Sequence, residues 1–118
     1  PERVPPSHKK HQSRSIEHQF NEPRSAVWPR LAAAVQSSSA TMLAVEPPWR
    51  LCADDSEAHP DLEFMEGTFV IRDDGSMCLV SWGLVFDPEP TETGIVAVEQ
   101  ALASTAELLE GLALERQR

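Results

Sequence analysis

Two apolar segments in the second half of the chain alternate in the way expected of β-strands. Residues 67–72 (GTFVIR) and 77–86 (MCLVSWGLVF) are rich in β-branched and aromatic residues, which favour strands. The four residues between them, 73–76 (DDGS), have the composition of a tight turn. The pattern therefore predicts a β-hairpin.

Strand alternation sorts the side chains of this hairpin into two faces. With Asp74 and Gly75 as a two-residue turn, the expected cross-strand pairs are Arg72 with Met77, Ile71 with Cys78, and Phe69 with Val80. A three-residue turn would move this register by one. The face that we expect in the core carries Phe69, Ile71, Cys78, Val80 and Trp82. The opposite face carries Thr68, Val70, Arg72, Met77, Leu79 and Ser81.

A long amphipathic helix is predicted from residue 94 to residue 115, with Thr91 or Thr93 as its N-cap. Apolar side chains recur there at alternating spacings of three and four, which places them on one side of a helix. At roughly 33 Å, such a helix is longer than the ~17–20 Å strands of a hairpin. The apolar side chains that extend beyond the hairpin are buried either within the monomer or in a dimer seam. The stripe consists of Ile95, Val98, Leu102, Thr105, Leu109 and Leu112, flanked by Ala101 and Leu108.

The first part of the chain is poorer in core-forming residues. Residues 1–25 are dominated by Pro, Ser, Gln, His and charged residues, so we expect a flexible, basic, Pro-rich tail there. Residues 30–36 (RLAAAVQ) predict a short helix after Pro29, and residues 41–45 predict a short strand. The predicted fold is α+β, with a hairpin or three-stranded antiparallel sheet packed on the long C-terminal helix in one domain, residues 26–118.

Charge is distributed unevenly over the 118 residues, whose formal net charge is −9. Residues 1–41 hold six Lys and Arg against three Asp and Glu, whereas residues 42–118 hold four against sixteen. We expect this acidic body to bind neither nucleic acid nor a membrane, because both recruit proteins through Lys and Arg. Residues 53–66 are interpreted as a solvated connection. It contains an acidic group: Asp54, Asp55, Glu57, Asp61, Glu63 and Glu66.

Residues that could carry chemistry are few. Cys52 and His59 could act as a nucleophile and its base, or as zinc ligands together with His8, His11 or His18. The paired spacing of zinc ligands and a third orienting group for catalysis are both missing, so we expect no metal, no cofactor and no catalysis. Cys52 and Cys78 could form one disulfide, but two thiols in this setting are more typical of a reduced, cytoplasmic protein.

The sequence favours a non-enzymatic protein–protein interaction domain that forms a homodimer or joins a larger assembly, with itself or another protein as partner. The sheet face with Val70, Met77 and Leu79 could instead be covered within the monomer, by the segment around Trp28 or Trp49. Two alternatives remain: an acidic inhibitor that imitates nucleic-acid phosphates, and a small enzyme that uses Cys52 or His59. The expected partner-binding residues are Val70, Met77 and Leu79 on the sheet, and Leu102, Leu109 and Leu112 on the helix.

Overall fold

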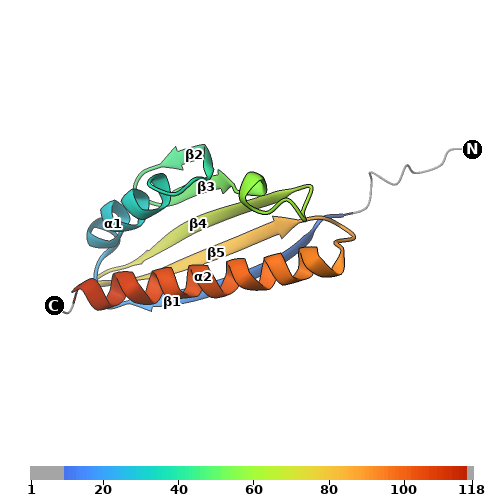
Figure 1. The fold of residues 1–118 in the computed structure, drawn as a ribbon. Coiled ribbons are helices and arrows are strands. Elements are labelled where there is room, and N and C mark those ends of the chain that lie inside the picture. The colour runs from blue at the N-terminus through green and yellow to red at the C-terminus, as the bar shows by residue number, and fades with distance from the viewer. Residues whose placement is uncertain (1–9, 117–118) are drawn as a thin grey trace, which may run out of the picture.

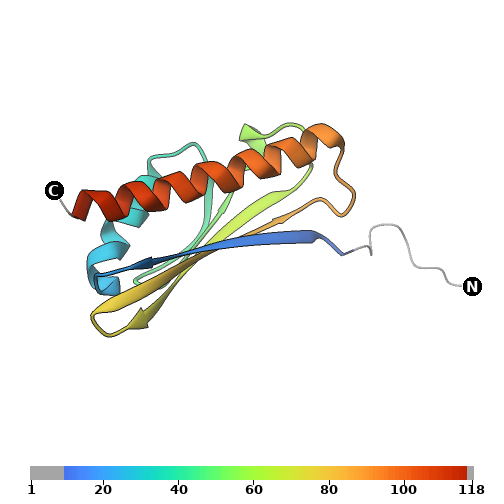
Figure 2. The same ribbon diagram turned by 90° about the horizontal axis from the view of Figure 1, so that it is seen from below.

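A five-stranded antiparallel sheet carries the two α-helices of the described chain on one of its faces (Figures 1 and 2). The structure is a computed structural model, and it describes residues 10–116. The strands lie in the order β1-β5-β4-β3-β2, so the α+β class is confirmed but the sheet has more strands than predicted. The elements are β1 (Gln12–Phe20), α1 (Arg24–Gln36), β2 (Thr41–Glu46), β3 (Arg50–Asp54), a 3₁₀ turn η2 (Ser56–Ala58), β4 (Met65–Asp74), β5 (Met77–Phe86) and α2 (Glu92–Arg116).

The β4–β5 hairpin has the two faces that the sequence predicts, in a different register. Ile71 pairs with Val80 and Phe69 with Trp82, because Gly75 and Ser76 form the turn rather than Asp74 and Gly75. Gly75 has a φ of 73°, which glycine adopts without strain. The predicted pairs are wrong by two residues, but a shift of two leaves every side chain on its predicted face. The predicted core face is buried throughout, at Phe69, Ile71, Cys78, Val80 and Trp82.

Strand β1 lies within the segment that we expected to be a flexible tail. It pairs with β5 along its whole length, from Gln12 opposite Phe86 to Phe20 opposite Cys78. Phe20 is only 1% exposed, and Ile16 packs on the core from the same face of the strand. The prediction is wrong for β1 because an edge strand anchored by so few apolar residues falls below the hydrophobicity expected of a strand. Residues 1–9 of the predicted tail lie outside the described residues.

Helix α1 begins at Arg24 rather than after Pro29, which lies inside the helix. Proline removes one hydrogen bond from a helix interior, and burial of the apolar face of α1 offsets that loss. The predicted end at Gln36 is confirmed, since Ser37 is the C-cap. The side chains of this helix that are buried are Val27, Leu31, Ala32 and Val35.

The predicted strand at residues 41–45 is present as β2, but its partner β3 was not predicted. Strand β3 extends to Asp54 and β4 begins at Met65. Residues 53–66 are therefore only partly the solvated connection that we expected. Ala53, Leu62 and Met65 are buried within that segment. A three-residue apolar run such as Leu51-Cys52-Ala53 is too short to distinguish a buried strand from a loop.

Helix α2 begins at Glu92, two residues before the predicted start. The predicted N-cap at Thr91 is confirmed, because its hydroxyl accepts a hydrogen bond from the backbone N–H of Gly94 at 3.0 Å. Most of its apolar stripe is buried within the monomer, whereas Thr105 and Leu108 are half-buried and Ile95 is 40% exposed. The structure therefore supports burial within one chain as the explanation of this stripe. Across residues 10–116, neither α-helix is both long and apolar enough to cross a membrane.

Candidate functional site

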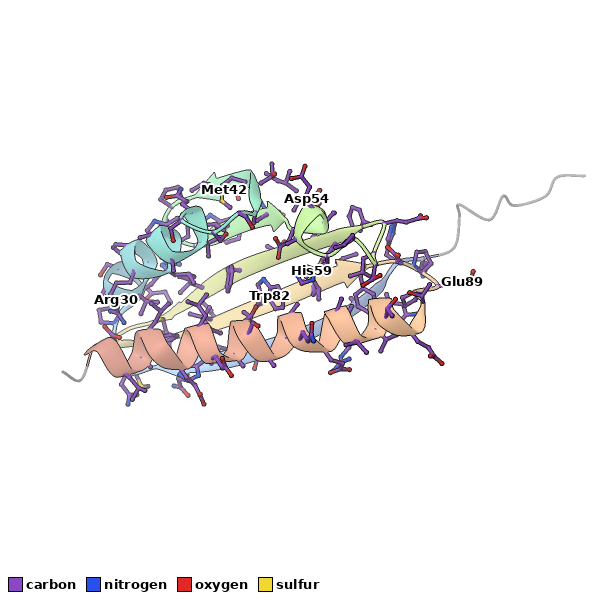
Figure 3. All side chains as sticks on the ribbon, in the orientation of Figure 1. Arg30, Met42, Asp54, His59, Trp82 and Glu89 are labelled. Carbon is purple, nitrogen blue, oxygen red and sulfur yellow. The ribbon has the colours of Figure 1, made fainter. Side chains whose placement is uncertain are left out.

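A cleft opens between α2 and the face of the sheet that carries the helices, here called the inner face (Figure 3). Its more apolar part, here called the inner cavity, has a volume of about 150 Å³. The lining is mainly apolar, as is typical of sites for small molecules. The floor is formed by Ala53, Met65, Gly67, Phe69, Trp82 and Leu84. The walls are formed by Ala34, Val35, Ser38, Ala40, Asp55, Thr105 and Leu108.

The indole ring of Trp82 forms the centre of the floor, and Gly67 on the neighbouring strand makes room for it. A Cβ atom at Gly67 would lie 2.6 Å from Trp82 Nε1, so a larger residue would displace the ring. On the same floor, the centroid of the Phe69 ring is 6.0 Å from that of Trp82. Within residues 10–116, the indole N–H of Trp82 donates no hydrogen bond, which leaves a donor in the cleft for a bound molecule.

The neighbouring part of the cleft, here called the mouth, is more polar than the inner cavity. It has a volume of about 320 Å³ and shares Asp55, Met65, Trp82 and Thr105 with the inner cavity, so the two spaces are adjacent. The mouth adds His59 from the end of η2, whose Nε2 lies 3.4 Å from Asp55 Oδ2. Figure 3 shows His59 on the same side of the sheet as Trp82. The remaining residues of the mouth, Gln100, Ala101 and Ser104, come from α2.

Hydrogen bonds fix the turn that carries Asp55 and His59. The carboxylate of Asp54 accepts hydrogen bonds from the hydroxyl and the backbone N–H of Ser56, and these two bonds lower the pKa of Asp54 below its ordinary value. The Ser56 hydroxyl also accepts a bond from the backbone N–H of Met65. The backbone N–H of His59 donates to the carbonyl of Ser56 at 3.0 Å. The mouth is therefore built on an ordered turn.

Two arginines connect α2 to the β1–α1 part of the chain, one through a hydrogen bond and one through an ion pair. Arg30 forms two hydrogen bonds with the buried carboxylate of Glu22, at 2.7 and 2.9 Å, and donates a third to the carbonyl of Leu112 at 2.6 Å. Figure 3 shows Arg30 beside the C-terminal end of α2. Near the middle of α2, Arg14 on β1 pairs with Glu99 at 2.9 Å. The Arg30–Leu112 hydrogen bond and the Arg14–Glu99 ion pair both join α2 to elements on or beside the sheet.

The cleft has one charged group of fixed sign. Among the described residues that line the inner cavity and the mouth, Asp55 is the carboxylate, and neither lysine nor arginine is present. Arg14 and Arg30 are engaged with Glu99 and Glu22 instead. The electrostatic potential inside the cleft is therefore expected to be negative near Asp55.

The structure separates the two groups of predicted partner-binding residues. Leu102, Leu109 and Leu112 are buried in the core, so the folded chain presents none of them to a partner. Val70, Met77 and Leu79 are half-buried on the other face of the sheet, here called the outer face. Trp28 packs with the core and Trp49 is exposed. Both α-helices lie on the inner side, so neither of them covers the outer face (Figure 2).

The six predicted acidic residues follow the path from β3 through η2 to β4. Asp55 is the member of this group that lines the cleft. Asp54 is engaged with Ser56, as described above. Glu57, Asp61 and Glu63 are exposed, and Glu66 is half-buried on β4. These positions do not test the predicted mimicry of nucleic-acid phosphates.

The cysteines and histidines are not brought together. Cys52 accepts a hydrogen bond from the Thr68 hydroxyl on the outer face, away from His59 in the cleft. Cys52 and Cys78 are both free and buried, and β4 separates their strands by roughly 9–10 Å, too far for a disulfide. His11 contacts Phe64 and His18 contacts Phe20, while His8 lies outside the described residues. No group that could hold a metal ion occurs within residues 10–116.

Several residues of the cleft were not predicted as site residues. Trp82 was correctly expected on the core face, but strand alternation cannot distinguish a core residue from one that lines a cavity. Gly67 at the start of a predicted strand was a usable signal, because glycine in a strand often marks close approach by another group. The position of Thr105 in an otherwise apolar stripe was a second one.

Comparison with known proteins identifies the fold but not a family. No protein-family model matches the chain, and no curated protein matches its sequence. Protein MLL2253 from Mesorhizobium loti has a similar structure, with a TM-score of 0.68 and 17% identity over 91% of this chain and 99% of that one. A START superfamily protein from Mycobacterium smegmatis gives a TM-score of 0.55 and 15% identity, over 89% and 98% of the two chains. The Zhui aromatase/cyclase from Streptomyces gives 0.57 and 13%, over 91% and 95%. The chain therefore has a START/Bet v1-like fold.

Proposed function

We propose that this protein binds a small, mainly apolar molecule in the cleft beneath α2. The observation that carries the proposal is a mainly apolar cavity whose floor contains an indole N–H with no intramolecular hydrogen-bond partner among residues 10–116. A cavity of about 150 Å³ lined by apolar side chains can hold one benzene ring. The mouth provides further space for the rest of a ligand and for its polar groups.

The wider similarity of fold agrees with this proposal. The structures that share the fold include an aromatase/cyclase and a START superfamily protein, which directs the search towards small organic molecules. Binding rather than catalysis is proposed, because His59 and Asp55 are the sole pair of titratable side chains among the described residues lining the cleft and no nucleophilic cysteine lies there.

A plugging substitution tests the proposal. Thr105 lines both the inner cavity and the mouth, whereas Ala106, the next residue of α2, is exposed. Benzyl alcohol is the neutral probe, and its binding is followed by the fluorescence of the tryptophans. We expect the wild type and Ala106→Phe to bind the probe and Thr105→Phe to lose binding. Equal binding by all three proteins would show that the probe binds elsewhere.

A second candidate function is self-association through the outer face. Neither α-helix covers this face (Figure 2), and it presents the half-buried apolar side chains of Val70, Met77 and Leu79. We propose a second copy of the chain as the partner, because uncharged apolar positions avoid the repulsion between two chains of net charge −9. A dimer by light scattering that Leu79→Glu dissociates and Ala106→Glu, on the exposed side of α2, leaves intact would support this candidate. A monomeric wild type would exclude it.

A further inference from the structure

We infer that the molecule bound in the cleft carries a protonated amino group, which pairs with Asp55 at the mouth. This inference rests on the proposed function and adds the chemical class of the ligand. An apolar amine, with its ring in the inner cavity and its amino group in the mouth, matches the distribution of apolar and polar residues along the cleft. The argument has three steps, which concern position, charge and accessibility.

Asp55 lies where the two parts of the cleft meet. It belongs to the lining of both the inner cavity and the mouth, as do Trp82 and Thr105. A ring in the inner cavity with its substituent turned towards the mouth would place that substituent beside Asp55. Charge-assisted hydrogen bonds between ammonium and carboxylate groups are among the stronger polar contacts in proteins.

The groups that face Asp55 leave its charge without a permanent counter-ion. His59 from the same turn lies 3.4 Å away, and its imidazole is a counter-ion only when protonated. The facing side chains of α2 are Gln100, Ser104 and Thr105, and those of the sheet are Met65 and Trp82; none of these is ionised. A ligand with a carboxylate or phosphate group would meet repulsion at this position.

Asp55 is accessible as well as partly shielded from water. Its side chain is 35% exposed, so a ligand can reach it, and the surrounding cleft reduces screening by solvent. The backbone of Asp55 is fixed independently of the carboxylate, because its N–H donates to the carbonyl of Met65 and its own carbonyl accepts from Ala58. Replacing the carboxylate therefore tests recognition without removing the turn.

Three probes with the same ring and different polar groups test the inference: benzylamine, benzyl alcohol and benzoate. A primary alkylamine is protonated at neutral pH, as lysine is. We expect benzylamine to bind about tenfold more tightly than benzyl alcohol and benzoate to bind most weakly, with the preference for the amine reduced by added salt. Asp55→Asn should remove the preference, whereas Glu57→Gln on the same turn, outside the cleft, should retain it.

The outcomes separate the inference from the proposed function. Equal binding of the three probes, or tighter binding of benzoate, would contradict the inference that the ligand is an amine. The cleft would still be a binding site. If Asp55→Asn still prefers benzylamine, Asp55 is not the group that pairs with the amine. Failure of every probe to bind the wild type would overturn both proposals. Retained benzyl alcohol binding by Asp55→Asn would confirm that this variant is folded.

Discussion

The two faces of the sheet are formed by the same five strands but differ in what covers them. The inner face supports α1 and α2, contains the buried core and holds the cleft. The outer face has no helix over it, and its apolar side chains, such as Val70 and Leu79, are half-buried among polar neighbours. Adjacent residues of one strand therefore have opposite roles, which provides matched controls for each prediction.

The largest expected effect concerns Arg30, which pairs with Glu22 and also donates a hydrogen bond from α1 to the Leu112 carbonyl of α2. Arg30→Met removes the guanidinium that makes two hydrogen bonds with the carboxylate of Glu22, which is only 4% exposed. Loss of one partner of a buried pair costs about 3 to 5 kcal/mol. Arg72→Met changes an exposed arginine of β4 and should alter the free energy of unfolding by less than about 0.5 kcal/mol. Urea unfolding of both variants measures the difference, and equal stabilities would contradict the role of Arg30.

Two valines of β5 compare the faces directly. Val80 is fully buried on the inner face, whereas Val85 is half-buried on the outer face. Val80→Ala should lower the free energy of unfolding by about 2 to 3 kcal/mol, because it leaves a cavity in the core. Val85→Ala should cost less than about 1 kcal/mol in the same denaturation experiment. A similar loss for both would mean that the outer face is covered in solution, as self-association would require.

Two glycines extend the comparison to the cleft. Gly67→Ala forces the Trp82 ring to move and should destabilise the fold by about 1 to 3 kcal/mol, with a change in tryptophan emission. At Gly83, on the outer face, a Cβ would meet nothing within 4 Å, so Gly83→Ala should be neutral or slightly stabilising. Unchanged emission from Gly67→Ala would show that the ring does not pack on Gly67.

The smallest effect concerns the thiols. Burial raises the pKa of Cys78, and the charges of Glu22 and Asp73 raise it further. Because the thiolate is the reactive form, iodoacetamide should label Cys78 in the native protein far more slowly than in urea. A raised pKa in the folded state also means that stability falls as the pH rises above about 8.5, where the unfolded thiol ionises. Cys52 is buried too, so rapid native labelling of Cys52 would revive it as a reactive residue.

Much of the fold could be predicted where several residues carry the same periodic signal. The faces of β4 and β5 and the stripe of α2 depend on alternation or helical spacing sustained over many positions. Strand β1 could not be predicted, because the neighbouring edge of β5, rather than its own sequence, makes Gln12–Phe20 a strand. The register of the hairpin depended on the identity of the two turn residues, which DDGS leaves open.

The candidate site was less predictable than the fold. Its residues come from α1, the β3–η2 region, β4, β5 and α2, so no continuous motif records it. Asp55 and His59 were both noted in the sequence, one as part of an acidic surface and the other as a catalytic or zinc-binding candidate. Their shared position at the mouth depends on the turn η2, which could not be predicted because the many charged residues of this segment suggested a solvated loop.

The three tryptophans provide the most direct test of the central claim that the cleft beneath α2 binds a small molecule. Trp82 lines the cleft, Trp28 packs on the core and Trp49 is exposed, so their indole N–H signals in a ¹H–¹⁵N spectrum report on three separate places. We predict that benzyl alcohol shifts the Trp82 signal in a saturable manner and leaves the Trp49 signal unchanged, with the effect absent in Thr105→Phe. A saturable shift of Trp49 alone, or no saturable shift of Trp82, would contradict the account.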